Sequence, residues 1–227
     1  MTVGTSPDPL RLRTLVVIAK EPVPGRVKTR LSPPFSPQQA AALAEAALAD
    51  TLAAVAAAPA ELRVLVLAGS PGSWLPDGFD VRPQAGGGLD ERIASALAGV
   101  DGPVLLVGMD TPQVTPALLA ADPRRDAWFG PAEDGGFWAL GLAEPDPELV
   151  LGVPMSQADT GAVQLARLRD AGLGVGLLPA LRDVDTAADA AEVAAAAPAT
   201  RFAATWRRFA AHPGPGHRTA ELSGGAA

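Results

Sequence analysis

A cationic segment lies between residues 20 and 30. Its sequence, KEPVPGRVKTR, has four Lys or Arg and one Glu, although the chain has 18 Lys and Arg against 25 Asp and Glu and a net charge of −7. Lys28 and Arg30 are suited to neutralising a di- or triphosphate, and Gly25 lets a ligand approach the backbone. The segment lacks the GxxxxGK[ST] pattern of a Walker loop. The plainer alternative is a solvated basic loop.

Acidic residues in two further motifs could hold a metal ion. Asp110 lies in GMDTP (108–112), and Asp183 and Asp185 lie in DVDT (183–186). Because one or two carboxylates and substrate phosphates usually hold Mg²⁺, we expect Asp110 to bind Mg²⁺ or Mn²⁺, with Asp183 or Asp185 as second ligand. The alternatives are a turn cap at Asp110 and a helix cap in DVDT.

Two glycine-rich motifs could complete a binding cleft. QAGGGL (84–89) precedes a predicted helix, where free N–H groups suit a ribose, base or phosphate. GPAEDGGF (130–137) offers Glu133, Asp134, Gly135 and Gly136 to an acceptor substrate. A purely structural hairpin is the alternative for this second motif.

Composition narrows the available chemistry. The chain has no Cys, and its two histidines, His212 and His217, follow the last predicted helix. A Ser-His-Asp triad and a Cys or His zinc site in the folded body are therefore excluded. The acidic balance disfavours nucleic-acid and membrane partners, and the N-terminus lacks the apolar region of a signal peptide, so we expect a cytoplasmic protein.

Hydrophobic patterning predicts alternating strands and helices. Unbroken apolar strands such as residues 14–19 are typical of a parallel sheet covered on both faces, so we predict an α/β fold, a three-layer α/β/α sandwich with a mostly parallel sheet. We expect one domain over residues 14–211, a disordered leader over 1–13 and a disordered tail over 212–227. The predicted strands are 14–19, 63–67, 79–82, 103–107, 127–129, 137–142 and 174–178, and the predicted helices run from Ser36 as N-cap to about 57, over 89–98, briefly from 115, and over 155–171, 186–197 and 199–211.

The motifs together resemble a known family. AKEPVPGRVKTRLSP (19–33), GMDTP, GPAEDGGFWALGL (130–142) and DVDT resemble, in order and spacing over about residues 14–195, small bacterial GT-A-like proteins of the nucleotide-diphospho-sugar transferase superfamily. These relatives are described as glycosyltransferases or as transferases associated with radical-SAM proteins. The first motif is also similar to the 2-phospholactate guanylyltransferases, and more distantly to the molybdenum-cofactor guanylyltransferases.

The resemblance implies a GT-A (Rossmann-like) fold, a nucleotide donor and a divalent ion. It implies catalytic roles for Lys28, Arg30 and Asp110, and metal binding by Asp110 with Asp185 or Asp183. Two departures are evident: residues 153–156 read VPMS where many relatives have Trp after Pro, and Gly108 replaces the first acid of a D-x-D pair. The implied nucleotide-binding set is Ala19, Lys20, Gly25, Arg26, Lys28, Arg30, Gln84, Gly86, Gly87, Gly88, Leu89 and Asp110.

Three functions are compatible with these residues. A nucleotidyltransferase would join a nucleoside triphosphate to a phosphate- or phosphonate-bearing small molecule, an acceptor that is already an anion and needs no general base. A glycosyltransferase acting on a hydroxyl would need Glu133, Asp134 or another carboxylate as base. The third is a catalytically silent nucleotide-binding module. We favour nucleotidyl transfer; the acceptor, the base and a homo-oligomeric state are left open.

Overall fold

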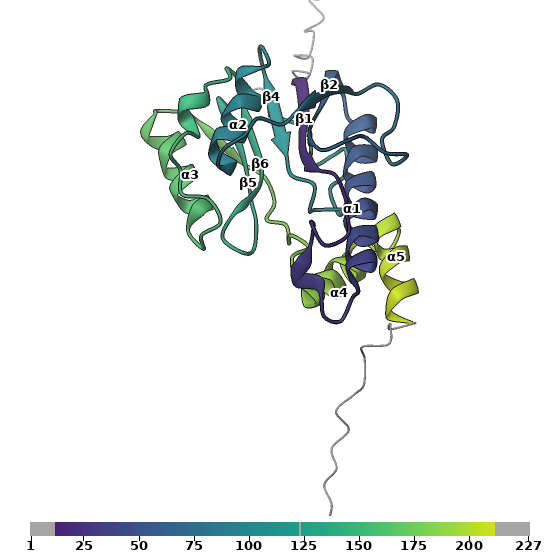
Figure 1. Cartoon of the computed structure of the whole chain (residues 1–227). Helices are drawn as coiled ribbons and strands as arrows, with labels where there is room; N and C mark the ends of the chain where they lie inside the picture. Colours follow the sequence, from purple (N-terminus) through teal and green to yellow (C-terminus); the bar gives the residue numbers. More distant parts are fainter. Residues whose placement is uncertain (1–11, 123, 212–227) are drawn as a thin grey trace, which may run out of the picture.

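A seven-stranded sheet with flanking helices forms the computed structural model, which describes residues 12–122 and 124–211 (Figure 1). The strands are β1 (Leu12–Lys20), β2 (Ala60–Ala68), β3 (Asp80–Pro83), β4 (Val104–Val107), β5 (Ala127–Pro131), β6 (Phe137–Leu142) and β7 (Val175–Leu177). The helices are α1 (Pro37–Ala57), α2 (Leu89–Ala98), α3 (Thr160–Asp170), α4 (Ala187–Ala196) and α5 (Arg201–Ala210), with 3-10 turns η1 (Thr29–Leu31) and η2 (Pro147–Leu149).

The strand order is β3-β2-β1-β4-β6-β5-β7, and only β6 runs against its neighbours. The other strands share one direction, so their carboxyl ends lie at the same edge of the sheet. Strand β6 begins at that edge, where Ala139 pairs with Val107 at the end of β4. The prediction of a mostly parallel sheet is confirmed.

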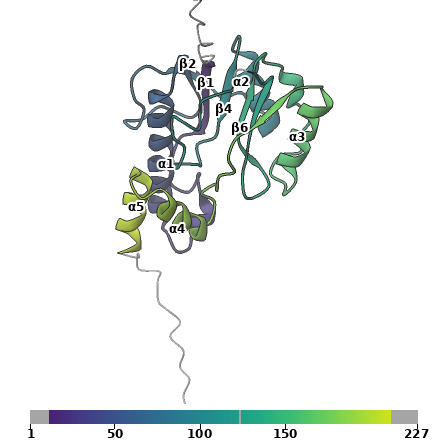
Figure 2. The same ribbon diagram turned by 180° about the vertical axis from the view of Figure 1, so that it is seen from behind.

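Helices cover both faces of the sheet. Leu15 and Val17 of β1 pack in one core with Leu52 of α1, whereas Val16 packs in a second core with Leu97 of α2. Figures 1 and 2 show α1 on one side of the strands and α2 and α3 on the other. Strand β1 is a continuous run of apolar residues because both of its faces are buried. The predicted three-layer sandwich is confirmed.

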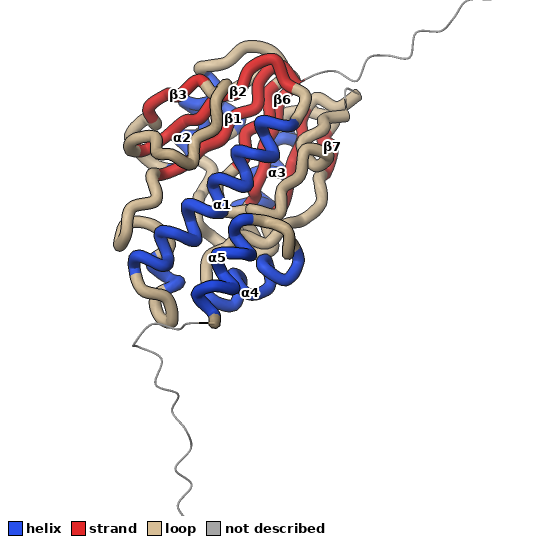
Figure 3. The backbone as a smooth tube through the Cα atoms, turned by 90° about the vertical axis from the view of Figure 1, so that its right-hand side faces the viewer, coloured by secondary structure: helices blue, strands red, loops and turns tan. Residues whose placement is uncertain are grey.

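Helix α1 begins at the predicted cap. The Ser36 hydroxyl accepts from the Gln39 N–H, the Gln39 side chain accepts from the Ser36 N–H, and Pro37 is the first helical residue. By length and composition α1 could cross a membrane, but 67% of its most apolar stretch is buried, as expected of a core helix. Helices α4 and α5 lie beside α1 (Figure 3), where Leu43 and Phe202 share a core.

Two helix predictions are wrong. The helix expected over 155–171 begins only at Thr160, because Ser156 has a positive φ of 60° and the Thr160 hydroxyl donates to the Pro154 carbonyl and accepts from the Gln157 N–H. The short helix expected from residue 115 is instead a set of turns closed by i to i+3 hydrogen bonds.

The expected ends of the domain differ slightly from the structure. Strand β1 begins at Leu12, so the last two residues of the expected leader belong to the sheet. The rest of that leader, the expected tail and both histidines lie outside the described residues.

Candidate functional site

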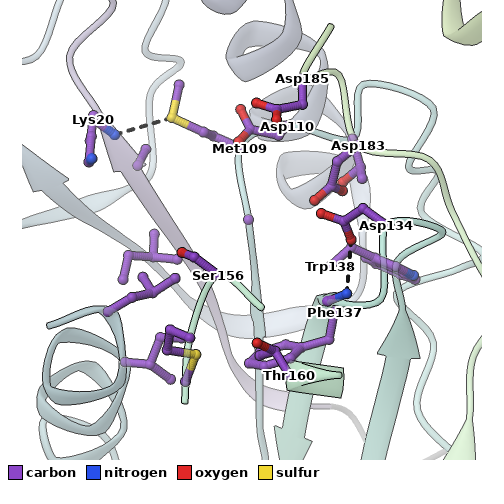
Figure 4. A pocket seen from close by; sticks show the side chains of 18 of the residues that line it. Lys20, Met109, Asp110, Asp134, Phe137, Trp138, Ser156, Thr160, Asp183 and Asp185 are labelled. Atoms are coloured by element: carbon purple, nitrogen blue, oxygen red, sulfur yellow. Dashed lines mark hydrogen bonds between the residues drawn. The ribbon is translucent and has the colours of Figure 1, made fainter. Parts of the chain in front are cut away.

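A cleft of about 740 Å³ opens at the edge of the sheet where the parallel strands end. It extends from Gln84, after β3, across the ends of β1 and β4 to Asp134 in the β5–β6 turn and to Asp183 after β7. Figure 4 shows Asp110, Asp134, Asp183 and Asp185 gathered on one side. In open α/β sheets, ligands bind beyond the carboxyl ends of the strands, so this is the place where a ligand is expected.

The cleft brings together most of the residues that the sequence motifs single out. Those that line it are Ala19, Lys20, Arg26, Lys28, Arg30, Gln84, Leu89, Asp110, Asp134, Gly136, Asp183 and Asp185. Gly25, Gly86, Gly87, Gly88, Glu133 and Gly135 do not line it.

Lys28 occupies the centre of the charged part of the cleft. Its Nζ lies 2.8 Å from Asp110 Oδ2 and 4.0 Å from Asp185 Oδ1, and its side chain is only 11% exposed. Its backbone is left-handed, with φ 49° and ψ 40°, a conformation that a residue with a Cβ rarely adopts. The buried side chains of Val27 and Leu31 hold the loop on either side.

Arg30 and Asp185 form a second ion pair at the mouth of the cleft. Arg30 Nη1 lies 2.5 Å from Asp185 Oδ2, and the Arg30 side chain is 76% exposed. The helix-cap alternative for DVDT is also realised, because the Thr186 hydroxyl accepts from the Asp189 N–H at the start of α4. One short motif therefore positions both a helix and a cleft carboxylate.

Asp110 and Asp183 each have a buried Oδ1 without a hydrogen-bond partner. Burial, followed by the negative charges of Asp110 and Asp134, raises the pKa of Asp183 to about 7, while Lys28 opposes the rise. Mg²⁺ and Mn²⁺ bind oxygen ligands, and buried carboxylate oxygens that lack hydrogen-bond partners are suited to this role.

The protein alone does not complete a metal site. Within residues 12–122 and 124–211, no group of three or more Asp, Glu, His or Cys side chains is arranged to hold an ion. Asp110 and Asp183 would thus supply two ligands, and substrate phosphates and water the rest. Of the two alternatives for the second ligand, Asp183 has a buried oxygen without a partner, as Asp110 does, whereas Asp185 Oδ2 is paired with Arg30.

Gln84 and Arg92 line the opposite part of the cleft. Gln84 Nε2 donates to the Ala19 carbonyl (3.0 Å) and to the Val66 carbonyl (3.3 Å), and Gln84 Oε1 accepts from Arg92 Nη1 (3.0 Å). The sequence motifs did not include Arg92. A usable signal was its position in the first turns of a helix that begins just after a strand end.

The β5–β6 turn contributes Asp134 and Gly136, but not Glu133. Asp134 Oδ1 accepts from the Gly136 N–H (2.9 Å; Figure 4), which fixes the carboxylate at the cleft. Glu133 Oε2 instead lies 2.6 Å from Arg182 Nη2, so the structure does not support its expected contact with an acceptor.

The segment that leads into α3 also belongs to the site. Residues 155–158 and Thr160 line the cleft together with Phe137 and Trp138, and Thr111 lies nearby. Residues 153–159 and 130–137 are where the sequence motifs place an acceptor pocket, whereas the continuous helix that apolar spacing favoured from residue 155 is not formed. Lys20 lines the cleft as expected, with an exposed side chain and with its N–H donating to Met109 Sδ at 3.2 Å (Figure 4).

Known structures share this fold. A candidate nucleotide-diphospho-sugar transferase from Desulfovibrio desulfuricans G20 is 27% identical with a TM-score of 0.78, over 88% of this chain and 96% of that one. A cytidylyltransferase from Leptospira borgpetersenii is 12% identical with a TM-score of 0.50, over 89% of this chain and 95% of its own. Rv0371c from Mycobacterium tuberculosis H37Rv is 23% identical with a TM-score of 0.50, over 79% of this chain and 96% of its own. The last two likenesses show the fold alone.

Sequence comparison places the chain in one family. No curated protein sequence matches it. A family model described as "Uncharacterized protein conserved in bacteria (DUF2064)" matches residues 37–157, which is more than half of the 227 residues and includes α1, α2, Asp110 and the β5–β6 turn. The chain therefore belongs to the DUF2064 family.

Proposed function

We propose that the protein is a metal-dependent nucleotidyltransferase, which joins a nucleoside triphosphate to a small phosphate- or phosphonate-bearing acceptor and releases pyrophosphate. The observation that carries the proposal is the 2.8 Å contact between Lys28, whose side chain is 11% exposed, and Asp110, next to the two buried carboxylate oxygens that lack partners. This combination of one buried cation with unsatisfied acids suits a metal-bound polyphosphate better than a neutral ligand.

The cleft's charges suggest how the triphosphate would lie. Arg26, Lys28 and Arg30 line its cationic side and would contact the phosphates, whereas Gln84 and Arg92 line the side where the nucleoside would bind. Asp110 and Asp183 would hold Mg²⁺ or Mn²⁺. When bound, that ion would neutralise charge on the phosphate oxygens.

In the proposed reaction, an acceptor oxygen forms a bond to the α-phosphorus, and the bond from that phosphorus to the oxygen leading to the β-phosphorus breaks. Lys28 and Arg30 would stabilise the charge that develops on the pyrophosphate. The acceptor is already an anion, so no residue has to remove a proton from it. This agrees with a cleft that has no His, Cys or Tyr among its lining residues.

Sugar transfer is a second candidate. The similarity to the Desulfovibrio desulfuricans protein favours it, and Asp134 with Asp183 provides carboxylates where an acceptor hydroxyl would need a base. The two candidates share the fold, the nucleotide and the cationic loop, and they differ in the leaving group.

The leaving group therefore tests the proposal. The protein would be incubated with Mg²⁺, each nucleoside triphosphate and a panel of small phosphate and phosphonate acceptors, and pyrophosphate would be measured; a parallel panel would use nucleotide sugars and measure nucleoside diphosphate. We expect acceptor-dependent pyrophosphate release that falls at least 100-fold in Lys28→Ala and Asp110→Asn. Nucleoside diphosphate release from a nucleotide sugar, without pyrophosphate release from any triphosphate, would overturn the proposal.

A further inference from the structure

The guanidinium of Arg92 is held in place by two hydrogen bonds. Its Nε donates to the Gly88 carbonyl (3.2 Å) and its Nη1 to Gln84 Oε1 (3.0 Å). Gln84 is itself fixed, because its Nε2 donates to the main chain of β1 and β2. An arginine has five N–H groups, so three remain for a ligand in the cleft that Arg92 lines.

An apolar surface lies beside this guanidinium. Leu89, Arg92 and Ile93 are three and four residues apart on α2 and all line the cleft. Leu89 is 37% exposed, which leaves an apolar side chain open to the cleft. A flat ring with polar edges can pack on such a surface and turn its edge toward the guanidinium.

This side of the cleft is unsuited to phosphate. Asp90 and Glu91 lie in the first turn of α2, and Glu91 Oε2 already accepts from the Gly88 N–H. Their negative charges oppose the positive end of the helix dipole, which would otherwise attract an anion. The phosphates of a nucleotide therefore belong with Lys28 and Arg30, and its base belongs near Arg92.

We propose that Arg92, positioned by Gln84, reads the nucleobase and selects a base with a carbonyl oxygen over a base with an amino group at the same position. This inference rests on the proposed function, since it needs a nucleotide in the cleft. A guanidinium only donates hydrogen bonds, so it can pair with carbonyl oxygen and ring nitrogen acceptors, but an exocyclic amino group would face it donor to donor. The side-chain amide of Gln84, with its Nε2 and Oε1 both engaged, is a positioning group for Arg92.

Two pairs of nucleotides differ in this one feature. Inosine and adenosine triphosphates differ at C6 of the purine and at the adjoining N1 proton, and uridine and cytidine triphosphates differ in the same way at C4 and N3. Dissociation constants would be measured with Mg²⁺ by calorimetry for all four. In the wild-type protein we expect the carbonyl member of the bound pair to be favoured about tenfold or more.

Variants separate base reading from a structural role. Arg92→Lys keeps the positive charge but loses the planar guanidinium, and Gln84→Ala removes the side chain that positions Arg92. In both variants the preference for the carbonyl member of the pair should fall to less than about threefold, while the variant still binds nucleotide. Arg30→Ala should weaken all four nucleotides alike and keep the ratio. Arg82→Ala is the matched control, because Arg82 lies outside the cleft, where it contacts Asp80 and the Gly99 carbonyl.

The outcomes distinguish the two proposals. Equal binding of the members of each pair, a preference for the amino member, or a ratio unchanged in Arg92→Lys and Gln84→Ala would overturn the role of Arg92 and leave the proposed function standing. If none of the four nucleotides binds to the wild-type protein, the role of Arg92 is overturned, and if guanosine triphosphate does not bind either, the proposed function fails with it.

Discussion

Lys28 Nζ lies 2.8 Å from Asp110 Oδ2, and this contact joins the loop after β1 to the segment that follows the neighbouring strand β4. Lys28 carries a strained backbone and Asp110 an unpartnered second oxygen, so neither residue is arranged for stability alone. In the proposed function, Lys28 neutralises Asp110 before a nucleotide binds and the phosphates afterwards.

The left-handed backbone of Lys28 gives a prediction on stability. Lys28→Ala and Lys28→Gly both remove the ion pair, but only glycine adopts a positive φ without strain. We therefore expect the free energy of unfolding in urea to be about 1 kcal/mol larger for the glycine variant than for the alanine variant. At Arg26, which lacks a positive φ, the Ala and Gly variants should show the opposite order. If Lys28→Ala is as stable as Lys28→Gly, the backbone at residue 28 is not strained and the prediction is wrong.

The raised pKa of Asp183 gives a prediction on pH. A carboxyl with a pKa of about 7 when folded and near 3.8 when unfolded binds more protons in the folded state between these values, so its contribution to stability falls as the pH rises from about 4 to 7 and is constant above. The free energy of unfolding of the wild-type protein, relative to that of Asp183→Asn, should fall by at most about 4 kcal/mol over this pH range. Denaturant unfolding with EDTA present measures this, and a difference that does not vary with pH would contradict it.

Gly135 links the β5–β6 turn to the segment before α3. Its φ is +92°, and an added Cβ would lie 1.9 Å from the Ala158 carbonyl oxygen. We therefore expect Gly135→Ala to cost about 2 kcal/mol or more in urea unfolding and to displace the acceptor side of the cleft. Gly86→Ala, where a Cβ meets nothing within 4 Å, is the control and should remain close to wild type. Similar unfolding free energies for the two variants would count against this link.

Asp50 ties α5 to α1. Its carboxylate accepts from the N–H groups of Arg201 (3.1 Å) and Phe202 (2.8 Å), the first residues of α5. Asp50→Ala should reduce the free energy of unfolding by about 1 to 2 kcal/mol, as for the loss of a helix cap. Glu45→Ala, at an exposed position of the same helix, should change it by less than about 0.5 kcal/mol. Equal effects of the two substitutions would show that the contact does not stabilise α5.

Local signals explain why much of the fold could be predicted. The apolar run of β1 is buried on both faces, and Ser36, Pro37 and Gln39 form a helix start that depends on neighbouring residues only. The start of α3 could not be predicted from apolar spacing, because it depends on the left-handed Ser156, on the contacts of the Thr160 hydroxyl and on the distant turn at Gly135, whose carbonyl accepts from the Gly161 N–H at 2.8 Å.

The positions of the cleft carboxylates were predictable, but their partners were not. Asp110 and Asp183 follow strands whose ends meet at one edge, so the sequence could bring them together. The pairing of Arg30 with Asp185 and of Glu133 with Arg182 depends on side-chain directions that no spacing encodes.

Thermal unfolding with Mg²⁺ and single nucleotides tests the central claim most directly, namely that Lys28 and Asp110 bind a metal-bound triphosphate. At about 100 times its dissociation constant, a ligand adds roughly 2.7 kcal/mol of stability. We predict that at least one nucleoside triphosphate raises the midpoint of wild-type protein, needs Mg²⁺ to do so, and has no such effect on Lys28→Ala or Asp110→Asn. Stabilisation by nucleotide sugars alone, or an equal response of the wild-type protein and both variants, would contradict the claim.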